Sequence, residues 1–167
     1  MSRELSICRR EQVVLFAASA VRLDAHCIGW LPWEFYEAQD AAGRLVSCTR
    51  NGDLVGFCAF SKPNWGMESK IVQVWVRKDA RQIEHGRALT QRCATIAAGL
   101  GAAWLTCWVA QDLDAMRFWP AIGFTEIAAR VGRGDIAEFA TRRTLSQFAR
   151  RCTVQKELTW QTTNAQP

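Results

Sequence analysis

The chain has 167 residues with a formal net charge of +5, and 49% of its residues are hydrophobic and 22% charged. This length and composition are typical of one soluble globular domain with a sizeable core, so we assign residues 1–167 to a single domain. No apolar run approaches the ~20 residues of a membrane span, and the N-terminus lacks the apolar core of a secretion signal. The seven cysteines are scattered without a C-x-x-C pair. This argues against disulfides and a metal site and favours a reducing, cytoplasmic setting.

The N-terminal quarter predicts a short strand and a helix, followed by an aromatic-rich connection. Arg3–Ile7 favours a strand, and the apolar positions of Arg10–Leu23 favour a helix with one buried face. His26–Asp40 contains a glycine and a proline that interrupt a regular pattern, so we expect a loop that leads into a short helix. Four aromatic residues cluster there: Trp30, Trp33, Phe35 and Tyr36. They either cap the core or line a pocket for a flat substrate.

The clearest local signal is a β-hairpin. Two strand-like runs, Arg44–Arg50 and Asp53–Phe60, flank Asn51-Gly52. This dipeptide favours a type I′ turn, because both of its residues tolerate a positive φ. The polar stretch Ser61–Ser69 then predicts a loop that leads to the next strand.

The central part of the chain predicts a strand, a charged turn and a helix in direct succession. Ile71–Val76 is apolar and β-branched, which favours a central strand of a sheet. Arg77–Glu84 is the turn, and His85–Leu100 has apolar residues at helical spacing. Backbone N–H groups converge at such a junction and can bind an anion.

The rest of the chain predicts another buried strand, a short helix and a final pair of strands. Ala103–Val109 favours the strand and Ala115–Trp119 the short helix. Thr125–Val131 and Asp135–Leu145 favour the last two strands. Ser146–Pro167 holds a short helical stretch and, from about residue 153, a polar tail.

Two stretches resemble sequence motifs of the GNAT N-acetyltransferases. In motif A of that family, Arg/Gln-x-x-Gly-x-Gly/Ala cradles the pyrophosphate of acyl-CoA. Arg81 and Gly86 match this pattern, and Glu84 stands at its first glycine position. The later stretch resembles motif B, Asn-x-x-Ala-x-x-Phe-Tyr-x-x-x-Gly-Phe, with Asp112 in the asparagine position and Trp119 in the tyrosine position. The matching residues of motif B are Ala115, Phe118, Gly123 and Phe124.

The resemblance covers roughly Leu45 to Leu145 and implies the GNAT fold, an α/β (α+β) architecture. We therefore expect a central, mixed, mostly antiparallel sheet of six to seven strands that is flanked by helices. This sheet should be splayed between the motif A strand and the next strand. The resemblance also implies an acetyl-CoA-dependent N-acetyltransferase in which an amine attacks the acyl group directly.

The resemblance further implies where cofactor and acceptor bind. Pantetheine would run along the motif A strand like a missing strand, and the pyrophosphate would contact the turn that follows. The implied cofactor-binding residues are Val74, Trp75, Val76, Arg81, Gln82, Ile83, Glu84, His85, Gly86, Arg87, Asp112 and Phe118. The implied acceptor-site residues are Trp30, Trp33, Tyr36 and Gln73.

The acid and the base of the family have no direct counterpart here. The usual acid is the motif B tyrosine, whereas Trp119 has no acidic proton. The usual base is a glutamate on the motif A strand, and that strand offers only Gln73. Glu68, Glu34 and Asp112 are the nearby carboxylates. We therefore name Glu68, Asp112 and Trp119 as catalytic candidates, with Trp119 as a wall near the thioester. Proximity and orientation alone can supply much of the acceleration.

Two other functions stay open at this point. One is a phage-type DNA-modifying enzyme on the same fold that acts on a nucleobase, and the other is a degenerate module that binds CoA or nucleic acid without catalysis. Aromatic and cationic residues side by side often hold nucleic acid. The basic C-terminal third contains Arg130, Arg133, Arg142, Arg143, Arg150, Arg151 and Lys156. The expected partners are a small-molecule, peptide or nucleobase amine, with nucleic acid and a homodimer as further options and no membrane partner.

Overall fold

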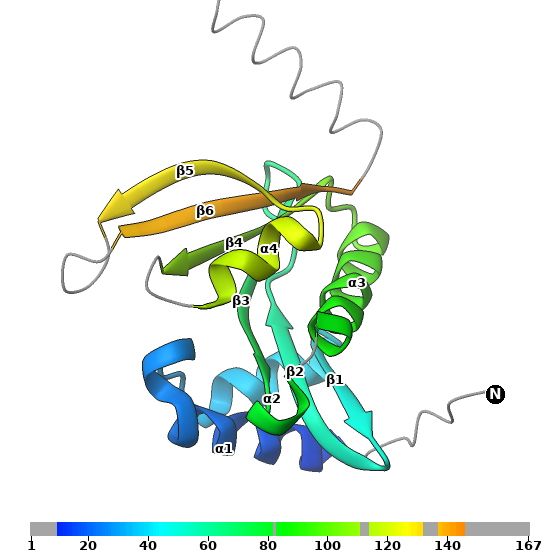
Figure 1. Ribbon diagram of the computed structural model, residues 1–167. Helices are drawn as coiled ribbons and strands as arrows, with labels where there is room; N and C mark the ends of the chain where they lie inside the picture. The colour runs from blue at the N-terminus through cyan, green and yellow to red at the C-terminus, as the bar shows by residue number, and fades with distance from the viewer. Residues whose placement is uncertain (1–9, 82, 111–113, 132–136, 146–167) are drawn as a thin grey trace, which may run out of the picture.

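The computed structural model describes residues 10–81, 83–110, 114–131 and 137–145 (Figure 1). The helices are α1 (Arg10–Ile28), α2 (Trp33–Ala41), α3 (Ile83–Gly99) and α4 (Phe118–Ala121), with 3-10 turns η1 (Lys78–Ala80) and η2 (Asp114–Arg117). The strands are β1 (Leu45–Arg50), β2 (Asp53–Phe60), β3 (Glu68–Val76), β4 (Trp104–Ala110), β5 (Thr125–Val131) and β6 (Ala137–Thr144). Across these ranges, no helix combines the length and apolar character that a membrane crossing requires.

The strands form one mixed sheet. Within the described residues it has six strands in the order β1-β2-β3-β4-β6-β5. Neighbours are antiparallel except β3 and β4, which are parallel. The β3–β4 pairing covers only Glu68–Lys70 opposite Trp104–Thr106, and beyond these residues the two strands diverge (Figure 1). The mixed, mostly antiparallel sheet and its splay are therefore confirmed. A seventh strand at Arg3–Ile7 would lie outside the described residues.

The β1–β2 hairpin turns at Asn51-Gly52, as predicted. Asn51 has φ 54° and Gly52 has φ 89°. A type I′ turn needs positive φ at both central residues, and its twist matches that of the flanking strands. Arg50 and Asp53 pair directly on either side of the turn. The hairpin thus forms for a reason contained in a few adjacent residues.

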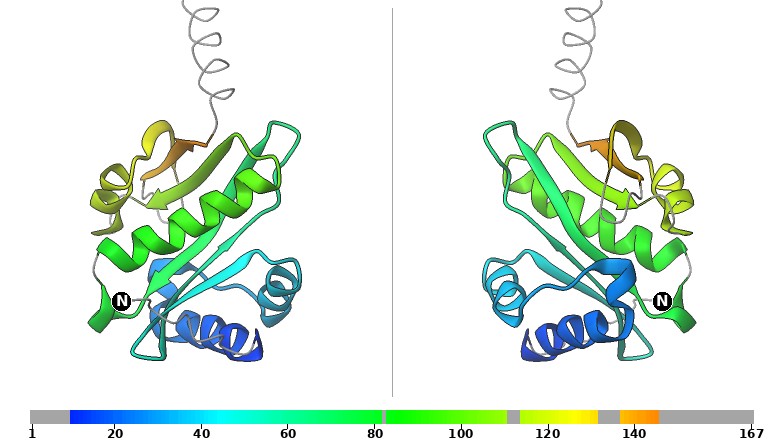
Figure 2. Two further views of the ribbon diagram at one scale, coloured as in Figure 1. Left: turned by 90° about the vertical axis from the view of Figure 1, so that its right-hand side faces the viewer. Right: turned by 90° about the vertical axis from the view of Figure 1, so that its left-hand side faces the viewer.

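Helices cover both faces of the first three strands (Figure 2). On one face α1 and α2 enclose a buried cluster that includes Tyr36, Phe57 and Trp75. On the other face α3 encloses a second cluster that includes Leu89, with Val74 packed against it. Val74 and Trp75 are neighbours on β3, so they serve opposite cores because side chains alternate along a strand. A hydrophobic cluster therefore packs on each face of β3 where the sheet splays.

Four element boundaries differ from the sequence prediction. The short helix predicted at Ala115–Trp119 is a 3-10 turn, η2, that ends at Arg117, and α4 follows from Phe118 to Ala121. The loop predicted from His26 begins only after Ile28, because α1 continues through an irregular residue at Asp24. β3 starts at Glu68, since the Ser61 N–H donates to the Lys70 carbonyl at 2.8 Å and ties the preceding loop to the strand. α3 starts at Ile83, inside the predicted turn.

Candidate active site

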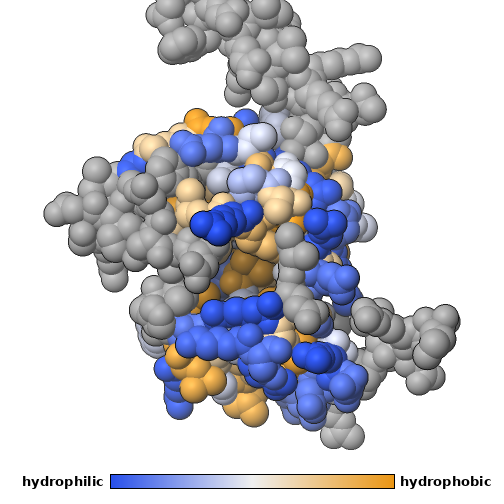
Figure 3. All heavy atoms as spheres, viewed as in Figure 1, coloured by the Kyte–Doolittle hydropathy of each residue, from blue (hydrophilic) through white to orange (hydrophobic). Residues whose placement is uncertain are grey.

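The splay leaves one edge of β3 open. From Ile71 onward, β3 pairs with β2 and not with β4 in the described residues. The register between β2 and β3 also skips Val72, since Gln73 pairs with Ala59 and Ile71 pairs with Phe60. A bulge of this kind re-aims backbone groups. Figure 3 shows an apolar hollow on this side of the molecule, below α4. The open N–H and C=O groups can bind a ligand with amide groups, as an added strand would.

A charged turn joins β3 to α3. Arg77 Nε and Nη2 donate to the two oxygens of Asp79 at 2.7 and 3.0 Å on the surface. These hydrogen bonds lower the pKa of Asp79 and raise the pKa of Arg77. α3 follows at Ile83, and the N–H groups of its first turn have no partners within the helix. Together with the positive end of the helix dipole, they suit an anion such as a diphosphate.

Arg81, the first matching residue of motif A, has its guanidinium bound by the protein itself. Its Nη2 donates to Asp24 Oδ2 at 2.5 Å, and its Nε donates to the Val76 carbonyl oxygen at 2.9 Å. The same Asp24 oxygen accepts a hydrogen bond from Trp75 Nε1 at 3.0 Å. Arg81 therefore joins the turn to the end of β3 and to α1, and its contact with a diphosphate stays a prediction.

Asp24 is absent from the residues that the sequence predicts for the site. A signal for it exists in the pattern of α1. Asp24 continues the helical spacing of three buried residues of the helix: Val13, Ala17 and Val21. A carboxylate on the core-facing stripe needs a partner. The spacing therefore predicts that the Asp24 carboxylate is buried and paired, but it does not identify the residue that pairs with it.

Gly86, the other matching residue of motif A, packs directly on Phe118 of motif B. A Cβ atom on Gly86 would lie 2.7 Å from Phe118 Cε2. The structure thus brings together two predicted cofactor-binding residues from α3 and α4. Arg87 supports the same contact, because its Nη2 donates to the Ala121 carbonyl oxygen at 3.3 Å.

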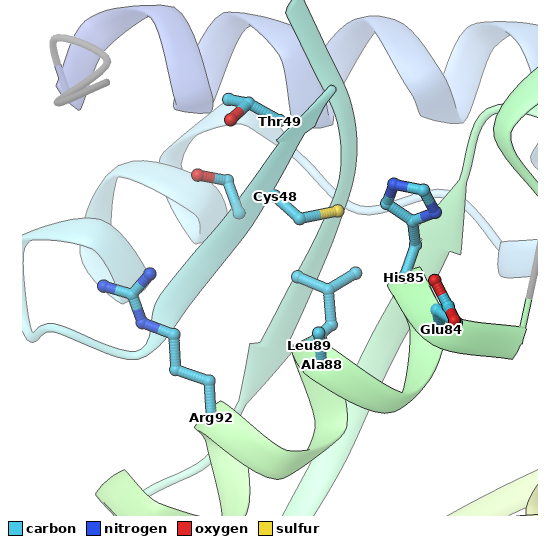
Figure 4. A pocket seen from close by; sticks show the side chains of 8 residues that line it. Cys48, Thr49, Glu84, His85, Ala88, Leu89 and Arg92 are labelled. Atoms are coloured by element: carbon cyan, nitrogen blue, oxygen red, sulfur yellow. The ribbon is translucent and has the colours of Figure 1, made fainter. Parts of the chain in front are cut away.

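Glu84 and His85 lie on the side of α3 that faces β1. They line a pocket of about 240 Å³ together with Cys48 and Arg92 (Figure 4). Burial raises the pKa of Cys48 to about 11, so its thiol is protonated at neutral pH. His85 Nδ1 is buried and has no hydrogen-bond partner among the described residues.

The Glu84 side chain lies on the β1 side of α3. Because it points away from α4, Glu84 can stand at a glycine position of motif A without blocking the α4 side of the turn. Gln82 lies outside the described residues.

Two predicted acceptor-site residues, Tyr36 and Gln73, form a buried hydrogen-bonded pair. The Tyr36 hydroxyl donates to Gln73 Oε1 at 2.7 Å. Gln73 Nε2 donates to the carbonyl oxygens of Ile28 at 2.9 Å and Gly29 at 3.0 Å. Burial raises the pKa of Tyr36 to about 12, so it is a neutral donor at physiological pH. These bonds fix the α1–α2 connection against β3. That connection carries two exposed aromatic side chains, Trp30 and Trp33.

Glu68, the predicted base, is not brought to the open edge of β3. It lies at the start of the strand, about 20 Å along an extended chain from Val74. Its Oε1 accepts a hydrogen bond from Thr106 Oγ1 at 3.0 Å, and its Oε2 lies 3.6 Å from Arg142 Nη2. The carboxylate is therefore engaged within the paired part of the sheet.

The two other catalytic candidates differ in what the structure says of them. Trp119 is 3% exposed and packs edge to face on Phe118 and Phe124, with ring centroids 5.2 and 4.9 Å apart. Trp119 lies in α4, and its ring packs into the core cluster that also contains Phe124. A contact between Trp119 and the thioester stays a prediction. Asp112 lies outside the described residues.

Part of the basic C-terminal third is engaged within the protein. The Arg130 guanidinium lies 4.0 Å from the Trp108 ring centroid, and that of Arg142 lies 5.1 Å from the Trp104 centroid. Arg143 Nη2 donates to the Gln91 side chain at 2.8 Å. The other basic residues lie outside the described residues: Arg133, Arg150, Arg151 and Lys156. A nucleic-acid partner stays a prediction.

Comparison with known proteins gives one family match. The sequence profile of the acetyltransferase (GNAT) family matches residues 12–124. No curated protein sequence matches the chain.

Solved structures with the same fold include a putative acetyltransferase, a named N-acetyltransferase and a protein named Ard1. yncA of Salmonella typhimurium, solved with its cofactor acetyl-CoA, is 18% identical with a TM-score of 0.65, over 84% of this chain and 92% of that chain. A ribosomal-protein-alanine N-acetyltransferase from Brucella melitensis is 16% identical with a TM-score of 0.65, over 82% and 96%. Ard1 from Thermoplasma volcanium is 17% identical with a TM-score of 0.67, over 84% and 95%. At these identities the likeness establishes the fold.

Proposed function

Since the chain belongs to the GNAT family of acetyltransferases, we propose that it transfers the acetyl group of acetyl-CoA to an amine of a small molecule or a peptide. One observation carries this proposal. β3 separates from β4 after Lys70, and the open strand leads directly to the turn and the N-terminus of α3. Such an open strand edge followed by a helix N-terminus suits a cofactor composed of amides and phosphates.

The residues present suit the pantetheine and the diphosphate of acetyl-CoA. The open backbone edge of β3 around Val74 suits the amides of pantetheine, and the first turn of α3 suits the diphosphate. Phe118 and Gly86 form a closely packed support between α3 and α4. When bound, acetyl-CoA supplies an activated acyl group in the form of a thioester with a thiolate leaving group.

The protein's own contribution is mainly binding and orientation. Tyr36 is a poor proton donor because its pKa is about 12, and the buried Trp119 indole is not an acid in water. Glu68 is engaged with Thr106 and Arg142. We therefore infer that the acceptor amine loses its proton to water and that proximity and orientation provide most of the acceleration. The rate should then rise with pH until the acceptor amine is neutral.

The acceptor approaches, in this proposal, beside the α1–α2 connection. Gln73 on β3 donates hydrogen bonds to the backbone of this connection at Ile28 and Gly29. These bonds fix the position of the connection relative to β3. Trp30 and Trp33 expose aromatic surface there. Such rings can pack on an acceptor that presents an apolar or aromatic face.

Two measurements on the purified protein test this function. Acetyl-CoA should raise the melting temperature, because a ligand at about 100 times its Kd stabilises the native state by about 2.7 kcal/mol. ATP serves as the control, since it carries phosphates without pantetheine. Free CoA thiol should then appear only when an amine is added, and the acceptor should gain one acetyl group in its mass spectrum. A folded protein that acetyl-CoA does not stabilise would remove the proposal. Stabilisation without transfer to any amine would favour a binding module.

A further inference from the structure

Asp24 is a buried carboxylate at an irregular point of α1. Its backbone has φ −141° and ψ 33°, and the residue is 2% exposed. A buried carboxylate is unfavourable unless charged or polar donors satisfy it. Its Oδ2 accepts hydrogen bonds from Trp75 Nε1 at 3.0 Å and from Arg81 Nη2 at 2.5 Å. One carboxylate oxygen on α1 therefore accepts hydrogen bonds both from β3 and from the turn that follows β3.

Arg81 is held between two fixed acceptors. Besides Asp24, its Nε binds the carbonyl oxygen of Val76, the last residue of β3, at 2.9 Å. The planar guanidinium presents its N–H groups in a rigid fork, so two such bonds set its orientation. This orientation in turn fixes where the chain leaves β3 and enters α3. The turn is thus anchored to a helix on the opposite face of the sheet from α3.

We propose that Asp24 is a positioning residue for the diphosphate-binding turn and that it acts through Arg81. This inference rests on the proposed binding of acetyl-CoA at the turn. The backbone N–H groups of the turn and of the first turn of α3 can serve a diphosphate only if their spacing is kept. Asp24 holds the Arg81 guanidinium against α1. When Asp24 is lost, Arg81 no longer ties the turn to α1, and the spacing of these backbone N–H groups changes. Hydrogen bonds weaken steeply when their donors are misaligned, so displaced N–H groups lose affinity for a diphosphate.

The test compares ligands with and without the diphosphate. Asp24→Asn should raise the Kd of CoA, measured by calorimetry, at least about tenfold. Dephospho-CoA, which keeps the diphosphate, should lose as much affinity as CoA. Pantetheine, which has no diphosphate, should half-saturate the thermal shift at an unchanged concentration. A merely structural role of Asp24 would weaken all three ligands alike.

Three further variants keep the test decisive. Glu37→Gln is the control, because it removes an exposed carboxylate from α2 and none from the turn. It should leave CoA affinity unchanged. Arg81→Lys keeps a cation beside Asp24 and thus spares the fold, but it loses the fork and should show the same diphosphate-specific loss. In an Arg81→Gln background, Asp24→Asn should have little further effect on CoA affinity, since the two residues act as one unit.

The outcomes separate this inference from the proposed function. A folded Asp24→Asn protein with undiminished CoA affinity, or with equal losses for CoA and pantetheine, overturns the positioning role alone. The same holds if Arg81→Lys binds CoA like the wild type. A wild-type protein that binds no CoA overturns both the positioning role and the proposed function.

Discussion

Gly86 of α3 and the ring of Phe118 of α4 are packed so closely that no side-chain carbon fits between them. A Cβ atom on Gly86 would lie 2.7 Å from Cε2 and 2.8 Å from Cζ of Phe118. Real Cβ contacts are longer, so any larger residue must displace the ring or the helix. The pair joins the two stretches of sequence that resemble motifs A and B.

Gly86→Ala should lower the free energy of unfolding. Overpacking costs about 1–3 kcal/mol, which outweighs the gain of about 1 kcal/mol that alanine brings to a helix interior. Gly99→Ala in the same helix is the control, because nothing lies within 4 Å of its Cβ position. Urea unfolding should show a loss for the first variant only, and Phe118→Leu should relieve it. Equal stability of the two alanine variants would contradict the packing account.

Tyr36→Phe should lower the free energy of unfolding by about 1–3 kcal/mol, because it leaves Gln73 Oε1 buried without its donor. The ring contacts with Phe35 and Phe57 are kept, so the change isolates the hydroxyl. Urea unfolding measures the loss. In a Gln73→Met background the same change should cost much less, since its partner is already absent.

The stability that Tyr36 contributes should disappear at alkaline pH. Burial raises its pKa from 10.0 to about 12. Because the folded pKa lies above the unfolded one, the contribution is complete below pH 10 and is lost as pH rises towards about 12. The difference in unfolding free energy between wild type and Tyr36→Phe should narrow in this window. The chain has one tyrosine, so phenolate absorbance reports its ionisation directly. Ionisation of the folded protein at the ordinary tyrosine pKa would refute this prediction.

Glu84→Gln should tighten CoA binding by at most about 1 kcal/mol, because it removes a negative charge from the first turn of α3. The gain should shrink as salt screens the field. Calorimetry at two salt concentrations measures it, with Glu37→Gln on the exposed face of α2 as the control. Weaker binding would show that the Glu84 carboxylate helps to order the turn.

Trp119→Phe should retain most of kcat at saturating acetyl-CoA, because the ring packs and transfers no proton. Trp119→Ala should lower the free energy of unfolding by about 3–5 kcal/mol, since it opens a cavity against Phe118 and Phe124. Steady-state kinetics and urea unfolding on both variants separate turnover from stability. Normal CoA affinity combined with a loss of turnover by orders of magnitude in Trp119→Phe would assign the indole a chemical role.

Features with local causes could be predicted from the order of the residues alone. Asn51-Gly52 forms its turn because two adjacent residues tolerate positive φ. The succession of strand, charged turn and helix around Arg81 follows from periodicity within a few residues, and the motif resemblance adds the family, the sheet and its splay. The ends of α1, β3 and α3 were less predictable: α1 continues past an irregular residue at Asp24, and a hydrogen bond from the Ser61 N–H to the Lys70 carbonyl ties the preceding loop to β3.

The contacts between distant side chains could not be predicted in this way. Asp24 and Arg81 are 57 positions apart, and nothing in the spacing of α1 names the arginine as its partner. Gly86 and Phe118 likewise come from separate stretches of the chain. Their spacing also does not predict that the Glu84 side chain points towards β1 and not towards α4. Backbone preferences act over a few residues of the chain, so a sequence reveals them directly. The partner of a buried charge or of a glycine depends on which distant element packs against it, and that is settled only when the sheet and its helices come together.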